Sequence, residues 1–149
     1  MQYRPARVEE IERLAQLRKQ QLIAEGQQPA CNMDRELHAF FMQGMQDDTL
    51  VEWVAEENGA LVATAAIIFY PFPPSFTNPG GVRGYLTNVY TSPAFRGRGI
   101  AGDLLRQLMA EAKKRKVSTL MLSASAMGRP VYEKLGFAGD KSWMTLRLE

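Results

Sequence analysis

The sequence has very little of what redox, metal or membrane-spanning proteins require. Its 149 residues include one cysteine, Cys31, and one histidine, His38. One thiol cannot form an internal disulfide, and one Cys with one His falls short of a recognisable metal site built from nitrogen and sulfur ligands. The most apolar stretch, residues 60–72, is far shorter than the ~20 residues that cross a bilayer. We therefore expect no zinc site, no structural disulfide and no transmembrane helix.

Excess charge of one sign is also scarce. The chain has 18 basic and 16 acidic side chains, a net charge of +2, which implies no dedicated nucleic-acid or membrane surface. The basic run Lys113–Lys116 is typical of a helix C-terminus, where cations interact favourably with the helix dipole. The first ten residues lack the apolar core of a signal peptide, so we expect a cytoplasmic protein.

What the chain does contain is the composition of a folded protein. Apolar residues make up 46% and charged residues 23%, close to the globular average. The length is that of one domain with a substantial core, and we expect residues 1–149 to form it.

Hydrophobic periodicity predicts alternating strands and helices. Asp34 is expected to cap the second helix, and Asn58-Gly59 suits a tight hairpin turn. The order predicts an α/β (α+β) fold, a mixed sheet with helices on its faces. Strands are expected at 2–6, 50–56, 60–70, 85–91, 119–123 and 143–148, and helices at 8–24, from 34 to about 45, from 100 to about 112 and at 130–134.

Residues 96–101, Arg-Gly-Arg-Gly-Ile-Ala, lie between a predicted strand and an amphipathic helix. Unpaired N–H groups in the first turn of a helix favour a phosphate, and Gly97 and Gly99 let it approach the main chain. Arg96 and Arg98 can add positive charge. The pattern favours an anion site, although a glycine-rich turn with two solvated arginines fits the same residues.

Two other phosphate-binding patterns fit these glycines less well. Gly97, Gly99 and Gly102 match G-x-G-x-x-G, but residues 119–125 offer no carboxylate to hold a ribose, as a dinucleotide fold requires. A Walker loop is excluded because Asp103-Leu104 stands where Lys and Ser/Thr are needed.

Residues 89–101, VYTSPAFRGRGIA, resemble the acyl-CoA binding motif of the GNAT superfamily of N-acyltransferases, R/Q-x-x-G-x-G/A. Residues 131–137, VYEKLGF, resemble that family's second signature, a tyrosine on a short helix before a Gly-Phe turn. The element order of the whole chain is similar to the family's, while the specific motifs lie between residues 84 and 137. The resemblance implies a mixed, mostly antiparallel central sheet with helices on both faces and two splayed parallel strands.

The resemblance also implies acetyl-CoA as cosubstrate, without a metal. Main-chain groups at 96–101 would hold the pyrophosphate, the strand 89–91 would pair with the pantetheine arm, and an N–H near Val89 or Tyr90 would face the thioester oxygen. Ser125 stands where the family often has asparagine, which puts its contact with the arm in question. The implied cofactor-binding residues are Val89, Tyr90, Thr91, Arg96, Gly97, Arg98, Gly99, Ile100, Ala101 and Ser125.

For the chemistry, the resemblance implies direct acetyl transfer to a primary amine in a ternary complex, which needs no enzyme nucleophile. Tyr132 aligns with the family's general acid, although packing beside the cofactor is an alternative role. The family's usual base does not carry over, because residues 71–95 contain neither Asp nor Glu and Tyr85 stands near the expected place. Glu52 or Glu56 acting through water, Asp34, or no dedicated base at all remain open.

Function and acceptor are less constrained. A noncatalytic module that binds CoA is the main alternative to an enzyme, and a nucleic-acid protein is a weaker one.

The acceptor could be a small amine, an antibiotic, an amino acid or a protein amine. A homodimer also stays open. Four residues hint at an apolar wall of the acceptor pocket, although core packing explains them equally well: Phe72, Phe76, Trp143 and Met144.

Overall fold

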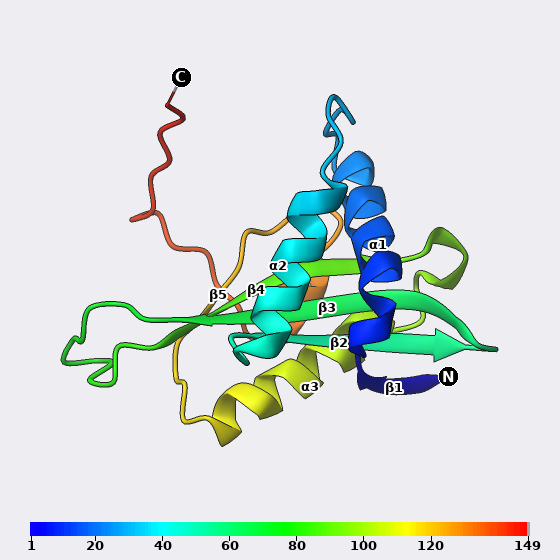
Figure 1. The fold of residues 1–149 in the computed structure, drawn as a ribbon. Helices are drawn as coiled ribbons and strands as arrows, with labels where there is room; N and C mark the ends of the chain where they lie inside the picture. The colour runs from blue at the N-terminus through cyan, green and yellow to red at the C-terminus, as the bar shows by residue number, and fades with distance from the viewer. Residues whose placement is uncertain (149) are drawn as a thin grey trace.

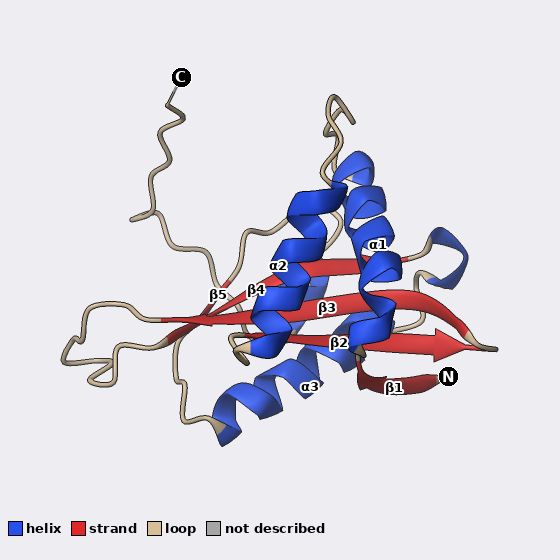
Figure 2. Ribbon diagram, in the orientation of Figure 1, coloured by secondary structure: helices blue, strands red, loops and turns tan. Residues whose placement is uncertain are grey.

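The computed structural model describes residues 1–148 as one mixed sheet with helices on both faces (Figures 1 and 2). The strand order is β1-β2-β3-β4-β5; the first four strands are antiparallel and β5 runs parallel to β4. This arrangement confirms the predicted fold class. The strands are β1 (Gln2–Pro5), β2 (Leu50–Glu57), β3 (Ala60–Tyr70), β4 (Arg83–Thr91) and β5 (Leu120–Met121), and the helices are α1 (Ile11–Ala24), α2 (Asp34–Gln46), α3 (Ile100–Lys114) and α4 (Arg129–Lys134).

Helices cover the central strands from both sides. On one face α1 and α2 bury Leu17 and Phe41 against Val54 of β2. On the other face α3 buries Leu104 and Leu108 among side chains of β3 and β4. Because β3 is covered on both faces, its sequence is almost unbroken in apolar character, as the periodicity indicated. The hairpin between β2 and β3 turns at Asn58 (φ 50°) and Gly59 (φ 80°), as predicted.

Two helix starts differ from prediction. Residues Val8–Glu10 form a 3-10 turn, so that α1 begins at Ile11. The cap of α2 is Met33, and Asp34 is already helical. The side chain of Asn32 accepts the N–H of Asp34 at 2.8 Å, so an asparagine two residues earlier satisfies the first N–H of the helix.

Of the two C-terminal strand predictions, the first is confirmed in part and the second is wrong. The strand expected at 119–123 shortens to Leu120–Met121, which is half-buried. The strand expected at 143–148 does not form, and residues 138–148 leave the sheet as an exposed segment (Figure 1). Alternating side chains give a segment strand propensity, but a strand forms only where a ladder partner lies beside it.

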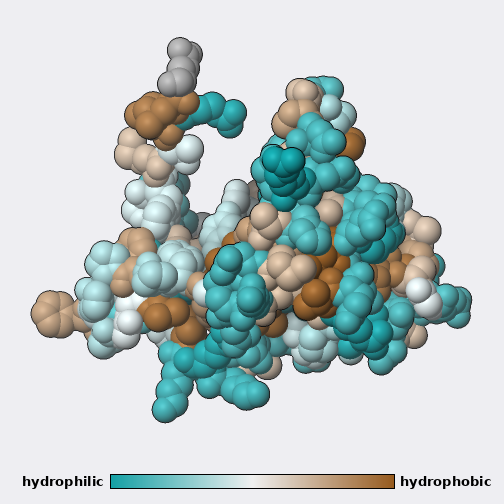
Figure 3. All heavy atoms as spheres, viewed as in Figure 1, coloured by the Kyte–Doolittle hydropathy of each residue, from teal (hydrophilic) through white to brown (hydrophobic). Residues whose placement is uncertain are grey.

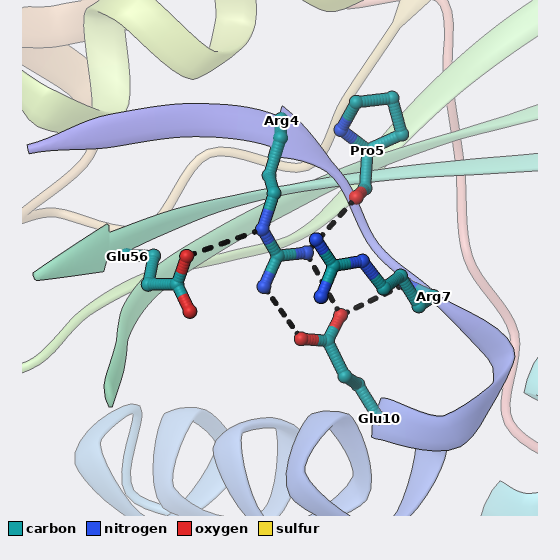
Figure 4. A network of polar contacts seen from close by, with 5 residues as sticks. All are labelled: Arg4, Pro5, Arg7, Glu10 and Glu56. Carbon is teal, nitrogen blue, oxygen red and sulfur yellow. Dashed lines mark hydrogen bonds and ion pairs between the residues drawn. The ribbon is translucent and has the colours of Figure 1, made fainter. Parts of the chain in front are cut away.

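A buried ion-pair network joins β1 to β2 and to the 3-10 turn (Figure 4). The Arg4 guanidinium donates to Glu10 at 2.6 and 3.0 Å and to Glu56 at 3.4 Å. The hydrogen bond to Glu10 raises the pKa of Arg4, and the same bond lowers the pKa of Glu10. Since Arg4 is buried, its partners compensate for the loss of water around the charge.

Replacing Arg4 tests the contribution of this network. Arg4→Met leaves Glu10 and Glu56 without their partner, and we expect the free energy of unfolding to fall by about 3 kcal/mol. Arg129→Met breaks an exposed pair with Glu133 and should cost under about 1 kcal/mol. Urea denaturation at pH 7 measures both, and equal losses would show that burial adds nothing to the Arg4 network.

Candidate active site

A cleft of about 1080 Å³ opens where β4 and β5 separate. Within residues 1–148 the parallel ladder joins only Gly84 to Leu120 and Tyr85 to Met121. Beyond Tyr85, residues 86–91 of β4 line one side of the cleft, and residues 123–128 line the other. The splayed parallel strands that we expected are therefore present, and the β4 backbone beyond Tyr85 has no ladder partner on this side.

A β-bulge in β4 lies at the middle of the cleft. Thr64 pairs with Tyr90 and Ala66 with Thr87, so that Asn88 and Val89 together oppose one residue of β3. Asn88 takes a left-handed conformation (φ 54°), which asparagine tolerates better than most residues. A bulge bends its strand and redirects side chains. Here it turns the Asn88 amide toward Glu52 under α1 and α2.

The glycine-rich turn at the start of α3 has the geometry of an anion cradle. Gly97 and Gly99 have φ of 76° and 78°, and a Cβ added at either position would meet open space. The first helical hydrogen bond of α3 joins the N–H of Asp103 to the carbonyl of Gly99 at 3.1 Å. The preceding N–H groups of the first turn are thus left for a ligand, as at any helix N-terminus.

The two arginines of this turn are partly occupied by the loop itself. Arg96 donates to the carbonyl of Thr91 at 3.0 Å, and its guanidinium lies 5.6 Å from the Tyr90 ring. Arg98 donates to the carbonyl of Ala94 at 3.2 Å. Arg96 lines the cleft, whereas Arg98 is absent from its lining. Of the residues that the resemblance implied for the cofactor, the ones lining the cleft are Val89, Tyr90, Thr91, Arg96, Gly97, Gly99, Ile100, Ala101 and Ser125.

Tyr132 also lines the cleft, from α4. Its ring packs against Gly128, where an added Cβ would come within 2.8 Å of the ring, and meets the Phe137 ring edge-on at 6.3 Å. Burial raises the pKa of the Tyr132 phenol, and the nearby Glu25 and Tyr85 raise it further. The hydroxyl is therefore protonated at neutral pH, as a proton donor must be.

Glu52 is a buried carboxyl group on β2, 3% exposed, on the sheet face covered by α1 and α2. It accepts a hydrogen bond from the Thr64 hydroxyl and one from the Asn88 amide at 3.4 Å. Burial raises its pKa to about 7, although these two hydrogen bonds and the charge of Arg18 act in the opposite direction. Glu52 therefore exchanges a proton close to neutral pH.

The surroundings of Glu52 can accommodate both of its protonation states. When Glu52 is ionised, the Thr64 hydroxyl donates to it. When Glu52 is protonated, its own O–H can donate to Thr64, because the Thr64 hydroxyl lies 3.3 Å from the Trp53 carbonyl and can donate there instead. The proton thus moves without leaving a buried donor or acceptor unpaired.

None of the three carboxyl groups considered as a base, Glu52, Glu56 and Asp34, lines the cleft itself. Glu56 pairs with Arg4, and Asp34 is exposed and pairs with Lys19 at 2.6 Å. Among the three carboxyl groups proposed from the sequence, only Glu52 forms a hydrogen bond with a residue that lines the cleft, Asn88. Both faces of β2 are covered, so Glu52 is buried.

Sequence reasoning missed a row of polar side chains along α1 that lines the cleft. Arg18 donates to Gln21 at 3.3 Å, and Gln21 donates to Glu25 at 3.2 Å. All three residues line the cleft. Their spacing of three and four residues on one helix face was the available signal, because side chains so spaced lie together.

None of the four residues considered for an apolar wall of the acceptor pocket lines the cleft: Phe72, Phe76, Trp143 and Met144. All four are exposed. The lone cysteine and histidine, Cys31 and His38, are also exposed and lie outside the cleft lining.

Comparison with known proteins places the chain in a family. Residues 11–137 match the profile of the acetyltransferase (GNAT) family, and the chain belongs to that family, which confirms the resemblance read from the sequence. It is therefore an enzyme of the N-acetyltransferase class. Within residues 1–148, no helix is both long and apolar enough to span a bilayer.

Solved structures and one curated relative are similar to the chain. A predicted acetyltransferase from Clostridium acetobutylicum, crystallised with acetyl-CoA, is 46% identical, with a TM-score of 0.95 and matches over 98% of this chain and 95% of that one. A GCN5-related N-acetyltransferase from Ralstonia eutropha is 26% identical, with a TM-score of 0.89 over 98% and 97% of the two chains. Glucosamine 6-phosphate N-acetyltransferase of Trypanosoma brucei brucei is 29% identical over 93 residues, and the match spans 62% of this chain and 61% of that enzyme.

Glu52 predicts a specific dependence of stability on pH. Its pKa is about 7 in the folded protein and near 4.5 when exposed, so the folded state binds the extra proton between these values. Stability contributed by this group is therefore complete below pH 4.5 and falls as the pH rises to 7, by on the order of 3 kcal/mol.

The isosteric variant Glu52→Gln removes this titration and keeps the hydrogen-bond partners. Chemical denaturation of both proteins between pH 5 and 8 should show the variant gaining stability relative to the parent as the pH rises. Parallel curves over this range would mean that the carboxyl group titrates normally.

Proposed function

We propose that the protein transfers the acetyl group of acetyl-CoA directly to a primary amine, with both substrates bound together in the cleft between β4 and β5. The observation that carries this proposal is the splayed ladder, which opens one continuous cleft from the glycine turn to Tyr132 and Asn88. The acetyl-CoA in the Clostridium structure, in a chain of nearly the same fold, supports the choice of cosubstrate.

The glycine turn and β4 are suited to hold the two halves of the coenzyme. Unpaired N–H groups at the start of α3 would bind the pyrophosphate, and the cleft-lining cations Arg96, Arg106 and Lys134 add positive charge around it. The open edge of β4 at 89–91 would pair with the amides of the pantetheine arm in the manner of an added strand. The acetyl thioester of the bound coenzyme would then lie where β4 and β5 separate.

The bulge at Asn88 and Val89 would position the carbonyl group of the thioester for attack by the amine. Backbone groups beside a bulge leave the regular ladder, so an N–H near Val89 or Tyr90 can face a thioester oxygen and stabilise its developing negative charge. The amine would enter from the α1 side, where Arg18, Gln21 and Glu25 present polar groups. Holding both substrates in one cleft can lower the barrier by several kcal/mol without an enzyme nucleophile.

Two side chains are suited to move the protons. A primary amine is mostly protonated at neutral pH and must lose a proton before it attacks. Glu52 takes up that proton through water beside Asn88, since its pKa is matched to neutral pH and its surroundings accept the protonated form. Tyr132 donates a proton to the departing sulfur, because its phenol is protonated and lines the cleft.

A noncatalytic CoA-binding module is the weaker alternative. Its main support was the absence of a carboxylate from residues 71–95. Glu52, which comes from β2 and contacts Asn88, supplies such a group from another strand and removes that support.

Two glycine substitutions separate coenzyme binding from backbone strain. Gly99 and Gly59 have φ of 78° and 80° with open space around an added Cβ, so alanine at either should cost a similar 1–2 kcal/mol, roughly, of stability. Gly99→Ala also places a methyl group in the anion cradle. By isothermal titration with CoA, we expect Gly99→Ala to weaken binding at least tenfold and Gly59→Ala to leave it unchanged, whereas equal affinities would contradict the cradle.

A turnover assay tests the reaction itself. Thiol release from acetyl-CoA is measured across a panel of small amines, amino acids and peptide N-termini. We expect a rate that rises with pH through about 7, a flattened rise in Glu52→Gln, and at least a tenfold lower kcat with unchanged CoA affinity in Tyr132→Phe. Tight CoA binding with no turnover on any amine would instead favour the noncatalytic module.

A further inference from the structure

Arg18 on α1 is a half-buried cation that lines the cleft. Hydrophilic residues cover much of the outer surface of α1 (Figure 3), as expected for a helix that packs its apolar side on a sheet. Arg18 differs from such fully solvated residues because part of its surface is removed from water. A charge in this position is favourable only when other groups replace the water that it has lost.

The protein itself supplies no anionic partner for the Arg18 guanidinium. Among the ion pairs of residues 1–148, none includes Arg18, whereas the half-buried Arg115 pairs with both Asp48 and Glu111. Within the same residues, the guanidinium of Arg18 forms one hydrogen bond, to Gln21 at 3.3 Å. A guanidinium carries several N–H donors, so most of those on Arg18 remain for a ligand or water.

Glu52 does not compensate this cation. Burial raises the pKa of Glu52 to about 7 against the opposing charge of Arg18, so Glu52 is only partly ionised at neutral pH. Its hydrogen bonds within residues 1–148 come from Thr64 and Asn88, not from Arg18. The cleft therefore contains a cation whose charge is still available to a bound molecule.

Gln21 holds Arg18 in place and connects it to a group of opposite charge. Gln21 is 7% exposed; its Oε1 accepts from Arg18 and its Nε2 donates to Glu25 at 3.2 Å. Glu25 lies two helical turns beyond Arg18, about 10 Å along the helix axis, and also lines the cleft. Like Arg18, Glu25 takes part in no ion pair of the described residues.

We infer that the acceptor is a small amine that also carries an anionic group, a carboxylate or a phosphate, and that Arg18 binds this anion in the cleft. The inference rests on the proposed acetyl transfer and names the class of acceptor for it. A guanidinium binds either anion through paired, charge-assisted hydrogen bonds. Glu25 attracts the protonated amine, whereas Arg18 repels an acceptor that carries a second ammonium group in place of the anion.

Arg18 determines specificity in this reaction and takes no part in the bond changes. The amine nitrogen bonds to the acetyl carbonyl carbon, the carbon–sulfur bond breaks, and CoA leaves as its thiol. Overall, the protonated amine supplies one proton to the sulfur and releases another to solvent. Holding the anion of the acceptor fixes the position of its amine relative to the thioester, which raises the rate by orientation.

Amines that differ in one terminal group test this assignment. Propylamine, β-alanine, aminoethylphosphonate and ethylenediamine share the same two-carbon link to the amine and end in a methyl, carboxylate, phosphonate or ammonium group. A second set compares alanine and phenylalanine with their decarboxylated amines. By thiol release from acetyl-CoA, we expect the anionic members to have a kcat/KM at least tenfold above their uncharged and dicationic counterparts. The better of carboxylate and phosphonate identifies the anion that the site takes.

Two variants then assign the preference to Arg18. Arg18→Met removes the cation from the cleft, and Arg13→Met removes the same charge from the same helix outside the cleft lining. The ratio of kcat/KM between anionic and uncharged amines should fall to within about twofold in Arg18→Met and persist in Arg13→Met. Isothermal titration with CoA shows whether the cleft of each variant is intact, and the comparison within the parent needs no variant.

The possible outcomes separate this inference from the proposed function. A parent that acetylates uncharged or dicationic amines as well as anionic ones overturns the inference and leaves the proposed transfer standing. A preference that survives in Arg18→Met also overturns it, because Arg18 then affects all acceptors alike, for example through Glu52. Tight CoA binding without turnover of any amine overturns the proposed transfer, and this inference with it.

Discussion

The interruption of the hydrogen-bond ladder between β4 and β5 determines what the rest of the molecule can do. Parallel strands normally continue pairing, yet here two residue pairs form, and the bulge at Asn88 and Val89 bends β4 as the strands part. Backbone groups that a longer sheet would have used internally become available to a ligand. Asn88 of the same bulge donates a hydrogen bond to Glu52, so a titratable group lies next to the point where the sheet opens.

Burial of charge has opposite consequences at two places in the fold. Arg4 is compensated by Glu10 and Glu56, and its network holds β1 in place. Burial of Glu52 disfavours its ionised form and brings its pKa to about 7, against the opposing effect of its two hydrogen bonds and of the Arg18 charge. The structure thus sacrifices stability at one buried carboxyl group, and such a group is useful where a proton must be exchanged at neutral pH.

Sequence reasoning recovered the elements whose signals are local. The Asn58-Gly59 turn, the apolar β3 and the amphipathic α3 were predicted because turn chemistry and periodicity act over a few residues. The motifs at 96–101 and Tyr132 located the cleft. Long-range pairing was not predictable: β5 shortened and the strand at 143–148 failed to form, because a strand needs a neighbour that local pattern does not supply. Glu52 was identified among several candidates, but its burial could not be predicted, because it depends on α1 and α2 packing over that face of β2.

Hydrogen exchange on the full chain, with and without acetyl-CoA, tests most directly whether the parted strands hold the coenzyme. The cleft geometry predicts that the amides of residues 87–91 and 97–102 exchange at least tenfold more slowly when acetyl-CoA is bound, while those of β1, on the far edge of the sheet, are unchanged. Unchanged exchange at both cleft segments under saturating acetyl-CoA would contradict the account.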